Sequence, residues 1–480
     1  MSAMMTLHQA TQWMPGARLV GENKVVVLRV HTDTRTIEPG DLFVALQGER
    51  YDANEFLQEA QQRGAVGVVC HAGLRADLYP AGLPRIEVAD TKAALQSLAM
   101  AWRRRFELPV IAVTGSNGKT TVTQMLAAIL EAQCPGGAAL ATRGNFNNDI
   151  GVPLTLLRLR AGHRMAVVEL GMNHPGEIAD LARIAQPTVA LVNNAQREHL
   201  EFMHTVQAVA EENGAVLSAL REDGVAVFPA GTPYTALWRG LAGARRCTTF
   251  GSDEGDVRCT HAHWSNGAWT VEIATPQGAL QGTLHIAGRH NVDNALAATA
   301  CALAAGVPLS DIACGLSAFA PVKGRSRAFS VPCGGRAITV VDDSYNANPD
   351  SVRAAILVLA ELPAPRLLVL GDMGEVGDQG PQFHAEAGAQ AQACGIEQLY
   401  ALGNQSAHAA AAFGAARHFD DMASLQAAVR EALPSVGSVL VKGSRFMKME
   451  QVVEAVAATA QENTMATGNE CRSMDGGAPC

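Results

Sequence analysis

VIAVTGSNGKTT, residues 110–121, is the stretch that decides the fold of this chain. Its first four residues are apolar and suit a buried strand. The residues that follow carry apolar side chains at helical spacing, namely Val122, Met125, Leu126, Ile129 and Leu130. A glycine-rich turn between a strand and a helix lets backbone N–H groups wrap phosphate oxygens, and the helix N-terminus adds a favourable dipole. The stretch therefore predicts a nucleotide-binding α/β fold.

The turn supplies the candidate ATP ligands Gly115, Ser116, Asn117, Gly118, Lys119, Thr120 and Thr121. Lys119 can neutralise the β- and γ-phosphates, and the Thr120 hydroxyl can hold Mg²⁺. The usual spacing GxxxxGK(S/T) needs a glycine where Val113 stands, so this is a shorter variant. A strand–helix turn without a ligand is the alternative. Lysine is rare here, which favours a functional Lys119; the chain has only Lys24, Lys92, Lys119, Lys323, Lys442 and Lys448.

Composition excludes several classes of protein. The 480 residues suggest roughly three domains. Hydrophobic residues make up 48% and charged residues 17%, which excludes intrinsic disorder. The net charge of −9 leaves no basic footprint, so we expect no nucleic-acid partner. The cysteines are scattered without a CxxC pair, which indicates free thiols rather than a zinc site or disulfides.

We expect neither a signal peptide nor membrane insertion. Residues 1–15 contain no lysine or arginine. The longest mostly apolar stretch, residues 295–309, is shorter than the roughly 20 residues that cross a bilayer, and it predicts a buried helix. These features predict a cytoplasmic protein, which we expect to be a monomer.

Short apolar runs alternate with helical stretches along the chain. Further strand candidates lie at 165–168, 189–192, 338–341, 367–370 and 439–441. Such alternation predicts parallel sheets with helices on both faces. We expect domains at 1–88, 89–322 and 323–460, and a disordered tail at 461–480.

Several longer motifs follow one another from about residue 19 to residue 460. They are TDTR (32–35), PGDLFVALQGERYDAN (39–54), TRGNFNNDIGVP (142–153), GRHNVDNALAA (288–298), KGR (323–325), DDSYNANP (342–349), GDMGEVG (371–377) and KGSR (442–445). Glu169 ends one apolar run, and His199 follows another. In these motifs the chain resembles the Mur ligase family. The resemblance implies three α/β domains: an N-terminal domain for a UDP-linked substrate, a central P-loop ATPase domain and a C-terminal Rossmann-like domain.

The resemblance also implies roles for individual residues. The expected catalytic residues are Lys119, Glu169, His199 and Arg325. The expected ligands of Mg²⁺, of which two ions are implied, are Thr120, Glu169 and His199. Besides the phosphate loop, ATP is expected at Asn291, Asn294, Arg325, Asp343 and Tyr345. The UDP-linked substrate is expected at Thr32, Thr34, Arg35, Gly48, Asp52, Asn54, Asn145, Asn147 and Asn148. The peptide side is expected at Asn346, Asn348, Asp372, Glu375, Lys442 and Arg445.

Simpler interpretations exist for some of these residues. Taken alone, the stretch at 39–54 is an ordinary strand and turn. A lone histidine such as His199 is more often a surface residue. The asparagines at 291 and 294 could equally cap a helix.

Asn213 departs from the family pattern. Many members carry a lysine at this place, with a carbamate that bridges toward the metal sites. We hypothesise that Asn213 or its neighbour Glu212 positions the second metal ion or its water. The alternative is that Asn213 only packs on a helix.

The activity implied by the resemblance is ATP-dependent amide synthesis through an acyl phosphate. The motifs at 371–377 and 442–445 favour the family member that adds D-alanyl-D-alanine to UDP-N-acetylmuramoyl-tripeptide, for peptidoglycan of the cell wall. Another muramyl-peptide ligase remains an alternative, as does folylpolyglutamate synthetase, although the N-terminal UDP motif argues against the latter. A P-loop switch that binds nucleotide without ligation is a further alternative. The third residue of the acceptor peptide, diaminopimelate or lysine, stays open.

Overall fold

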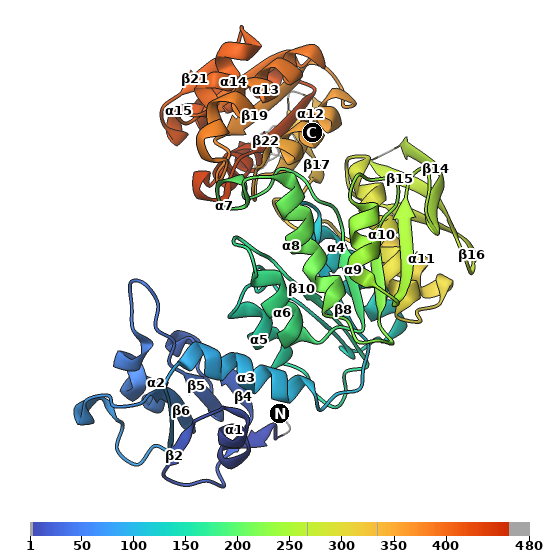
Figure 1. The fold of residues 1–480 in the computed structure, drawn as a ribbon. Helices are drawn as coiled ribbons and strands as arrows, with labels where there is room; N and C mark the ends of the chain where they lie inside the picture. Colours follow the sequence, from blue (N-terminus) through green and yellow to red (C-terminus); the bar gives the residue numbers. More distant parts are fainter. Residues whose placement is uncertain (1–2, 266, 334, 460–480) are drawn as a thin grey trace, which may run out of the picture.

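The computed structural model describes residues 3–265, 267–333 and 335–459, so the tail predicted at 461–480 lies outside the described residues. Figure 1 shows three bodies along the chain: an N-terminal one in blue, a central one from cyan to yellow, and a C-terminal one in orange and red. Each body is built on a main β-sheet of its own. The three α/β units agree with the predicted fold class, while the exact domain boundaries stay predictions.

The N-terminal body is a five-stranded sheet. Its strands, in spatial order, are β2 (Arg18–Val20), β7 (Arg85–Val88), β6 (Gly67–His71), β5 (Asp41–Val44) and β4 (Arg29–His31). All pairs are parallel except β2–β7. The short strands β1 (Met5–Thr6) and β3 (Val26–Val27) pair separately. The helices are α1 (Leu7–Trp13), α2 (Leu57–Gln62) and α3 (Thr91–Arg103).

The central body is a nine-stranded sheet. Its strands, in spatial order, are β16 (Gly278–Leu284), β15 (Ala268–Thr275), β14 (Val257–Ser265), β13 (Arg246–Gly251), β12 (Val225–Pro229), β11 (Val189–Val192), β8 (Val110–Thr114), β10 (Met165–Glu169) and β9 (Ala139–Ala141). The pairs from β14 to β9 are parallel, as predicted. The antiparallel extension formed by β14, β15 and β16 was not predicted.

Helices cover both faces of the parallel part of this sheet. The helices of the central body are α4 (Lys119–Gln133), α5 (Gly151–Leu156), α6 (Glu177–Ala185), α7 (Leu200–Met203), α8 (Val206–Ser218), α9 (Thr235–Ala242), α10 (His290–Ala304) and α11 (Leu309–Ala318). Of these, the short α7 lies beside the C-terminal body rather than on the sheet, and α11 packs on α4 and on β16 (Figure 1). Strand β8 has apolar residues on both faces because both faces are buried. Ile111 and Val113 pack in the core that holds α4, α10 and α11, while Val110 and Ala112 pack in the core on the opposite face.

The core on that opposite face is continuous with the N-terminal body. One cluster of buried side chains joins residues such as Leu7 and Ile86 to α3 and to Val168 and Ile178 of the central body. In Figure 1, α3 lies between the two bodies. The C-terminal body instead has two cores of its own, and Ala287 is the buried residue of the central body that joins one of them.

The C-terminal body is a six-stranded sheet. Its strands, in spatial order, are β17 (Arg327–Cys333), β18 (Arg336–Asp343), β22 (Ser438–Lys442), β19 (Arg366–Gly371), β20 (Gln398–Leu402) and β21 (Arg417–Phe419). Among these strands only the β17–β18 pair is antiparallel. The helices named for this body are α12 (Pro349–Ala360), α13 (Gly380–Ala393), α14 (Ser406–Phe413) and α15 (Met422–Ala432). Short 3-10 turns in the chain lie at Thr34–Thr36, Ala53–Phe56, Ala76–Leu78, Gly377–Gln379, Leu433–Ser435 and Arg445–Met447.

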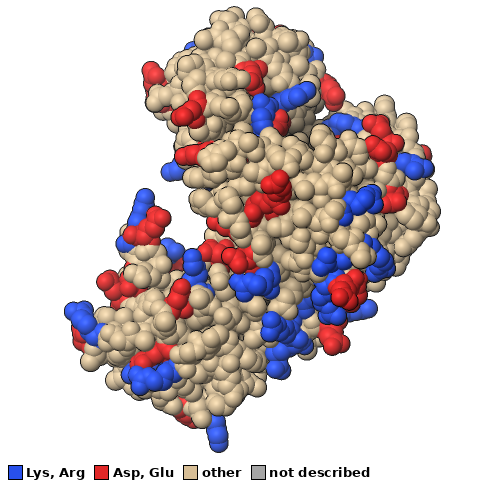
Figure 2. Space-filling view, in the orientation of Figure 1, with Lys and Arg blue, Asp and Glu red and all other residues tan. Residues whose placement is uncertain are grey.

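The apolar stretch near residue 295 is indeed a buried helix, α10. Across the described ranges, no helix has both the length and the apolar character needed to cross a membrane. On the face shown in Figure 2, basic and acidic side chains are interspersed, and the surface is deeply hollowed between the N-terminal and C-terminal bodies.

Gly315 in α11 offers a test of the packing on the central sheet. A methyl group added at Gly315 would lie 2.3 Å from the Cα atom of Ile129 in α4. Because backbone cannot rotate away, the two helices would have to separate, so we expect Gly315→Ala to cost about 1–3 kcal/mol. The matched control is Gly240→Ala in α9, where nothing lies within 4 Å of the new methyl group. The control should be neutral or stabilising, because alanine favours helix over glycine. Equal thermal midpoints for the two variants would contradict this packing.

Candidate active site

A cavity of about 1170 Å³ brings together residues of the central and C-terminal bodies, and Lys92 and Gln96 of α3 also line it. Its wall contains most of the predicted site residues: Ser116, Asn117, Gly118, Lys119, Thr120, Thr121, Asn145, Asn147, Asn148, Glu169, His199, Asn291, Asn294, Arg325, Asp343, Tyr345, Asn346, Asn348, Glu375, Lys442 and Arg445. The wall is formed at the carboxyl ends of β8, β10, β11 and β18, which is where open parallel sheets bind ligands.

The phosphate loop has a backbone that only glycine accepts readily. Gly115 has a φ of 131° and Gly118 a φ of 81°. A Cβ atom at Gly118 would lie 2.3 Å from Oδ1 of Asn294, and one at Gly115 would lie 3.0 Å from the backbone N of Asn194. Gly115 itself lies behind the cavity wall. Both glycines are therefore fixed by close neighbours as well as by conformation.

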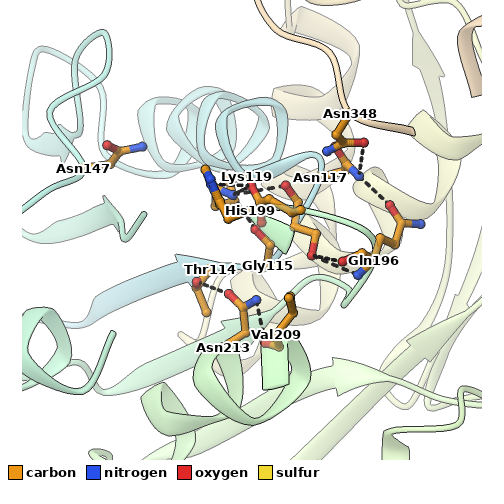
Figure 3. Close-up of polar contacts among 12 residues, drawn as sticks. Thr114, Gly115, Asn117, Lys119, Asn147, Gln196, His199, Val209, Asn213 and Asn348 are labelled. Carbon is orange, nitrogen blue, oxygen red and sulfur yellow. Dashed lines mark hydrogen bonds and ion pairs between the residues drawn. The ribbon is translucent and has the colours of Figure 1, made fainter. Parts of the chain in front are cut away.

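Lys119 is held at the start of α4 by oxygen atoms. Its Nζ donates to Oε1 of Glu198 at 2.7 Å and to the carbonyl oxygens of Gly115 and Ser116 at 2.5 and 3.1 Å. Figure 3 shows Lys119 lying back over the loop toward Gly115. The ammonium group therefore lies over the phosphate loop, where the motif predicts it.

His199 lies between two carboxylates. Its Nδ1 lies 2.6 Å from Oε2 of Glu375, and its Nε2 lies 3.5 Å from Oε1 of Glu198. Burial alone would lower the pKa of His199, but the two carboxylates outweigh burial and raise the pKa to about 9. The ion pair with His199 in turn lowers the pKa of Glu375. The two carboxylates therefore favour the charged imidazolium form of His199.

Glu169 has one oxygen in use and one free. Its Oε1 accepts hydrogen bonds from Thr120 Oγ1 at 3.1 Å and from Asn147 Nδ2 at 2.8 Å. Its Oε2 is buried and accepts no hydrogen bond from the residues that the structure describes. A buried carboxylate oxygen without a donor suits a cation. In the described part of the chain, however, no three His, Cys, Asp or Glu side chains gather as a ready metal site.

Buried amides connect the loop to α10. Asn193 Nδ2 donates to the carbonyl of Asn117 at 2.7 Å and to Oδ1 of Asn294 at 2.9 Å, and Asn294 Nδ2 donates to Oδ1 of Asn291 at 2.8 Å. Asn291 Nδ2 bonds the carbonyl of Ala287 at 2.7 Å. Asn291 and Asn294 therefore fix the loop in addition to lining the cavity.

The C-terminal wall of the cavity is charged. Lys442 Nζ donates to Oδ2 of Asp343 at 2.6 Å, and Ser326 N donates to its Oδ1 at 2.9 Å. Burial would raise the pKa of Asp343, but Lys442 lowers it below the ordinary value. The guanidinium carbons of Arg325 and Arg445 lie 4.2 and 5.3 Å from the ring centroid of Tyr345. These groups suit the recognition of an anionic ligand with hydroxyl groups.

The remaining predicted residues lie outside this cavity. Those of the N-terminal body are Thr32, Thr34, Arg35, Gly48, Asp52 and Asn54. Arg35 is paired with Asp33, and the buried Asn54 bonds Asp52 and the backbone of His71. Asp372 also lies away from the cavity, where its Oδ1 accepts from Ser406 N at the start of α14.

Asn213 and Glu212 also lie away from the cavity wall. Asn213 is fully buried, accepts from Thr114 Oγ1 at 2.6 Å and donates to the carbonyl of Val209 at 3.0 Å (Figure 3). Glu212 accepts from the N–H groups of Gly176 and Ile178 at the start of α6. This placement favours the packing role over the metal-positioning hypothesis.

Sequence reasoning missed the residues between β11 and His199. Gln196 and Glu198 contact the phosphate loop, and Arg197 binds Asp350 of the C-terminal body. No local motif marks these residues. The only signal was their position between a strand end and a predicted metal ligand.

Family models match most of the chain. The Mur ligase family catalytic domain matches residues 27–103, the Mur ligase middle domain residues 113–302, and the Mur ligase glutamate ligase domain residues 327–445.

Relatives match over nearly the full length. The UDP-N-acetylmuramoyl-tripeptide–D-alanyl-D-alanine ligase of Escherichia coli is 40% identical over 95% of this chain and 98% of its own. The Bacillus subtilis enzyme of the same name is 34% identical over 90% of this chain and 93% of its own.

Solved structures agree. A crystal structure of MurF from Acinetobacter baumannii superposes with a TM-score of 0.86 at 34% identity, covering 95% of this chain and 100% of that one. MurF from Thermotoga maritima in complex with ADP gives a TM-score of 0.79 at 25% identity, covering 91% and 98%. With the three matched domains, the fold and these relatives taken together, the chain belongs to the Mur ligase family.

Proposed function

We propose that this chain is an ATP-dependent ligase that joins D-alanyl-D-alanine to UDP-N-acetylmuramoyl-tripeptide, giving the pentapeptide used for peptidoglycan. The names of the relatives support the substrates. The observation that carries the proposal is the single cavity in which the phosphate loop and Glu169 face Arg325, Asp343 and Lys442. A cavity shared by two bodies can hold an activated acid and an amine together.

The reaction has two chemical steps. The terminal carboxylate of the tripeptide attacks the γ-phosphorus of ATP, the bond from that phosphorus to the bridging oxygen breaks, and ADP leaves. The amine of D-alanyl-D-alanine then attacks the acyl carbon, the bond to the phosphate oxygen breaks, and phosphate leaves while the amine loses a proton. No enzyme nucleophile is required, so the side chains act by positioning and by charge.

Cationic side chains neutralise the transferred phosphoryl group. Lys119 starts α4, so its ammonium and the N–H groups of the loop act on the same phosphates. Phosphate oxygens would replace Oε1 of Glu198 as its partner. Arg325 enters from the C-terminal body and stacks on Tyr345, which fixes its direction.

Mg²⁺ fits Thr120 and Glu169. The free Oε2 of Glu169 and the adjacent hydroxyl are hard oxygen ligands, and Mg²⁺ in such enzymes uses one or two carboxylates together with substrate phosphates. Bound there, the ion would neutralise charge on those phosphates. A second Mg²⁺ ion with His199 as its ligand stays a prediction. Both ring nitrogens of His199 face carboxylates, so neither is free for a metal ion in this arrangement.

Assignments for the rest of the chain complete the proposal. Residues 1–88 take the UDP part of the acceptor, 89–322 bind ATP, and 323–460 serve the amine side. Asn145, Asn147 and Asn148 lie in the same cavity wall as Glu169 and would contact the UDP-linked acceptor there. A monomeric state and a cytoplasmic location belong to the same proposal.

A product assay tests the function. With ATP, Mg²⁺, UDP-N-acetylmuramoyl-tripeptide and D-alanyl-D-alanine, we expect phosphate release that depends on the dipeptide and a UDP-N-acetylmuramoyl-pentapeptide by mass spectrometry. Acceptors ending in diaminopimelate and in lysine are run side by side. If the chain binds nucleotide but forms neither product, the alternative of a P-loop switch protein would be supported. If it instead joins glutamate to a folate, the chain would be a folylpolyglutamate synthetase.

Lys119→Ala tests the phosphate loop. The substitution removes the ammonium group that stabilises the transferred phosphoryl group. This should lower kcat by about 10²–10³-fold, a size typical of such electrostatic contacts. Lys24→Ala is the matched control, because Lys24 is exposed in the N-terminal body and should leave kcat unchanged. A Lys119→Ala enzyme with more than half of the wild-type kcat would refute the assignment.

Glu169→Gln tests the proposed metal site. The amide keeps the shape but loses the charge, so the Mg²⁺ concentration for half-maximal rate should rise at least about 10-fold, the smallest cost typical even for groups behind a metal ligand. Glu222→Gln, at an exposed position, serves as the control and should not shift the Mg²⁺ titration. An unchanged Mg²⁺ titration in Glu169→Gln would place the metal elsewhere.

A further inference from the structure

Residues 196–199 form a short segment between the phosphate loop and the C-terminal body. The segment follows β11 and precedes α7. Its successive side chains point alternately to the two neighbours: residues 196 and 198 contact the phosphate loop, and residues 197 and 199 contact the C-terminal body. We call residues 196–199 the strap.

The face of the strap toward the phosphate loop is held by hydrogen bonds to Ser116, Asn117 and Lys119. Oε1 of Gln196 accepts from Asn117 Nδ2 at 2.6 Å, and the backbone N of Gln196 donates to Ser116 Oγ at 2.9 Å. Glu198 accepts from Lys119 at 2.7 Å. The strap therefore contacts the loop at the residues predicted to bind phosphate. Its Glu198 pairs with the ammonium group of Lys119, which is the group predicted to bind the phosphates of ATP.

The opposite face of the strap depends mainly on Arg197. Its guanidinium donates to Oδ1 of Asp350 at 2.9 Å, its backbone N donates to Oδ2 of Asp350 at 2.8 Å, and its Nη1 donates to Glu386 at 2.9 Å. The side chains of Arg197 and Asp350 are 27% and 19% exposed, so water weakens this pair less than an open surface pair. Asp350 lies in the first turn of α12, and Glu386 lies in α13.

Asn348 closes a ring of contacts. Its Oδ1 caps α12 by accepting from Ser351 N at 2.8 Å, and its Nδ2 donates to Oδ1 of Asn117 at 2.9 Å. Figure 3 shows Asn117, Asn348 and Gln196 converging. The start of α12 is thus held by the phosphate loop directly and by Arg197 through the strap. Tyr345 and Asn346 of the cavity wall lie just before it in the chain.

We propose that the strap couples phosphate binding at Lys119 to the position of the C-terminal body, with Arg197 as its positioning residue. Phosphate at Lys119 competes with Glu198, and Glu198 is covalently next to Arg197. Because Arg197 holds α12 and α13, a shift of Glu198 is transmitted to the body that carries the amine side. The proposal rests on the nucleotide-binding part of the proposed function.

Small-angle scattering of the full chain measures the coupling. Saturating Mg²⁺ and a non-hydrolysable ATP analogue should change the radius of gyration of the wild type. In Arg197→Gln we expect at least half of this change to be lost while the analogue still binds. Asp350→Asn should cause the same loss, and the double variant should lose no more, because the two residues act as one pair. Asp350→Asn also serves if Arg197→Gln does not fold.

A kinetic readout separates positioning from simple destabilisation. The KM for D-alanyl-D-alanine should rise about fivefold or more in Arg197→Gln, in the range of ordinary coupling factors, with a smaller effect on kcat. Arg197→Lys keeps the charge and should recover part of the loss. Arg221→Gln is the control, because it breaks an exposed pair with Asp223 at 3.2 Å, away from the strap, and should change neither readout.

The outcomes are distinct. The proposed coupling is overturned if the radius of gyration of Arg197→Gln changes as much as that of the wild type when the analogue binds. It is also overturned if the radius of the wild type does not change. Absence of pentapeptide in every protein, with the radius still responding to nucleotide through Arg197, would overturn the proposed reaction and leave the strap standing.

Discussion

The buried amide contacts behind the phosphate loop are the constraint on which the site depends. Asn193 ties the carbonyl of Asn117 to Asn294, so the end of β11, the loop and the start of α10 take one arrangement. Gly118 lets Asn294 approach closely enough for this contact. Because these amides satisfy one another away from water, loss of any partner leaves a buried polar group unpaired. The loop is consequently positioned before any ligand contributes.

Charge in the cavity is balanced by pairs that a substrate can exchange. Lys119 and Lys442 each pair with a carboxylate, and His199 pairs with Glu375. When an anionic ligand pairs with one of these cations, the carboxylate that the cation had bound loses its ion pair and must move to another partner. Such exchange costs less than the burial of a new charge, because the cation is already desolvated. The site thereby links ligand binding to local rearrangement.

Local patterns carried much of the prediction, and long-range contacts explain what was missed. The strand, turn and helix around residues 110–130 follow from spacing alone, and the structure has them as β8 and α4. The strands β14 to β16 escaped notice because they lie half exposed outside the alternating pattern.

Several side chains could not be placed from motifs. Arg197 meets Asp350 across 153 residues, and no local signal announces such a pair. Asp372 and Asn348 occupy motif positions, but the Oδ1 atom of each accepts from a backbone N–H at the start of a helix. The resemblance named residues that the structure brings into one cavity, whereas the partner of each polar atom needed the fold.

The hydrophobic cluster that runs from the N-terminal body through α3 into the central body has a consequence for how the chain is divided. Each of the three bodies has a core of its own, but only the N-terminal and central bodies also share a large common one. A cut between the N-terminal and central bodies would divide this shared core, whereas a cut after the central body would leave every large core nearly whole.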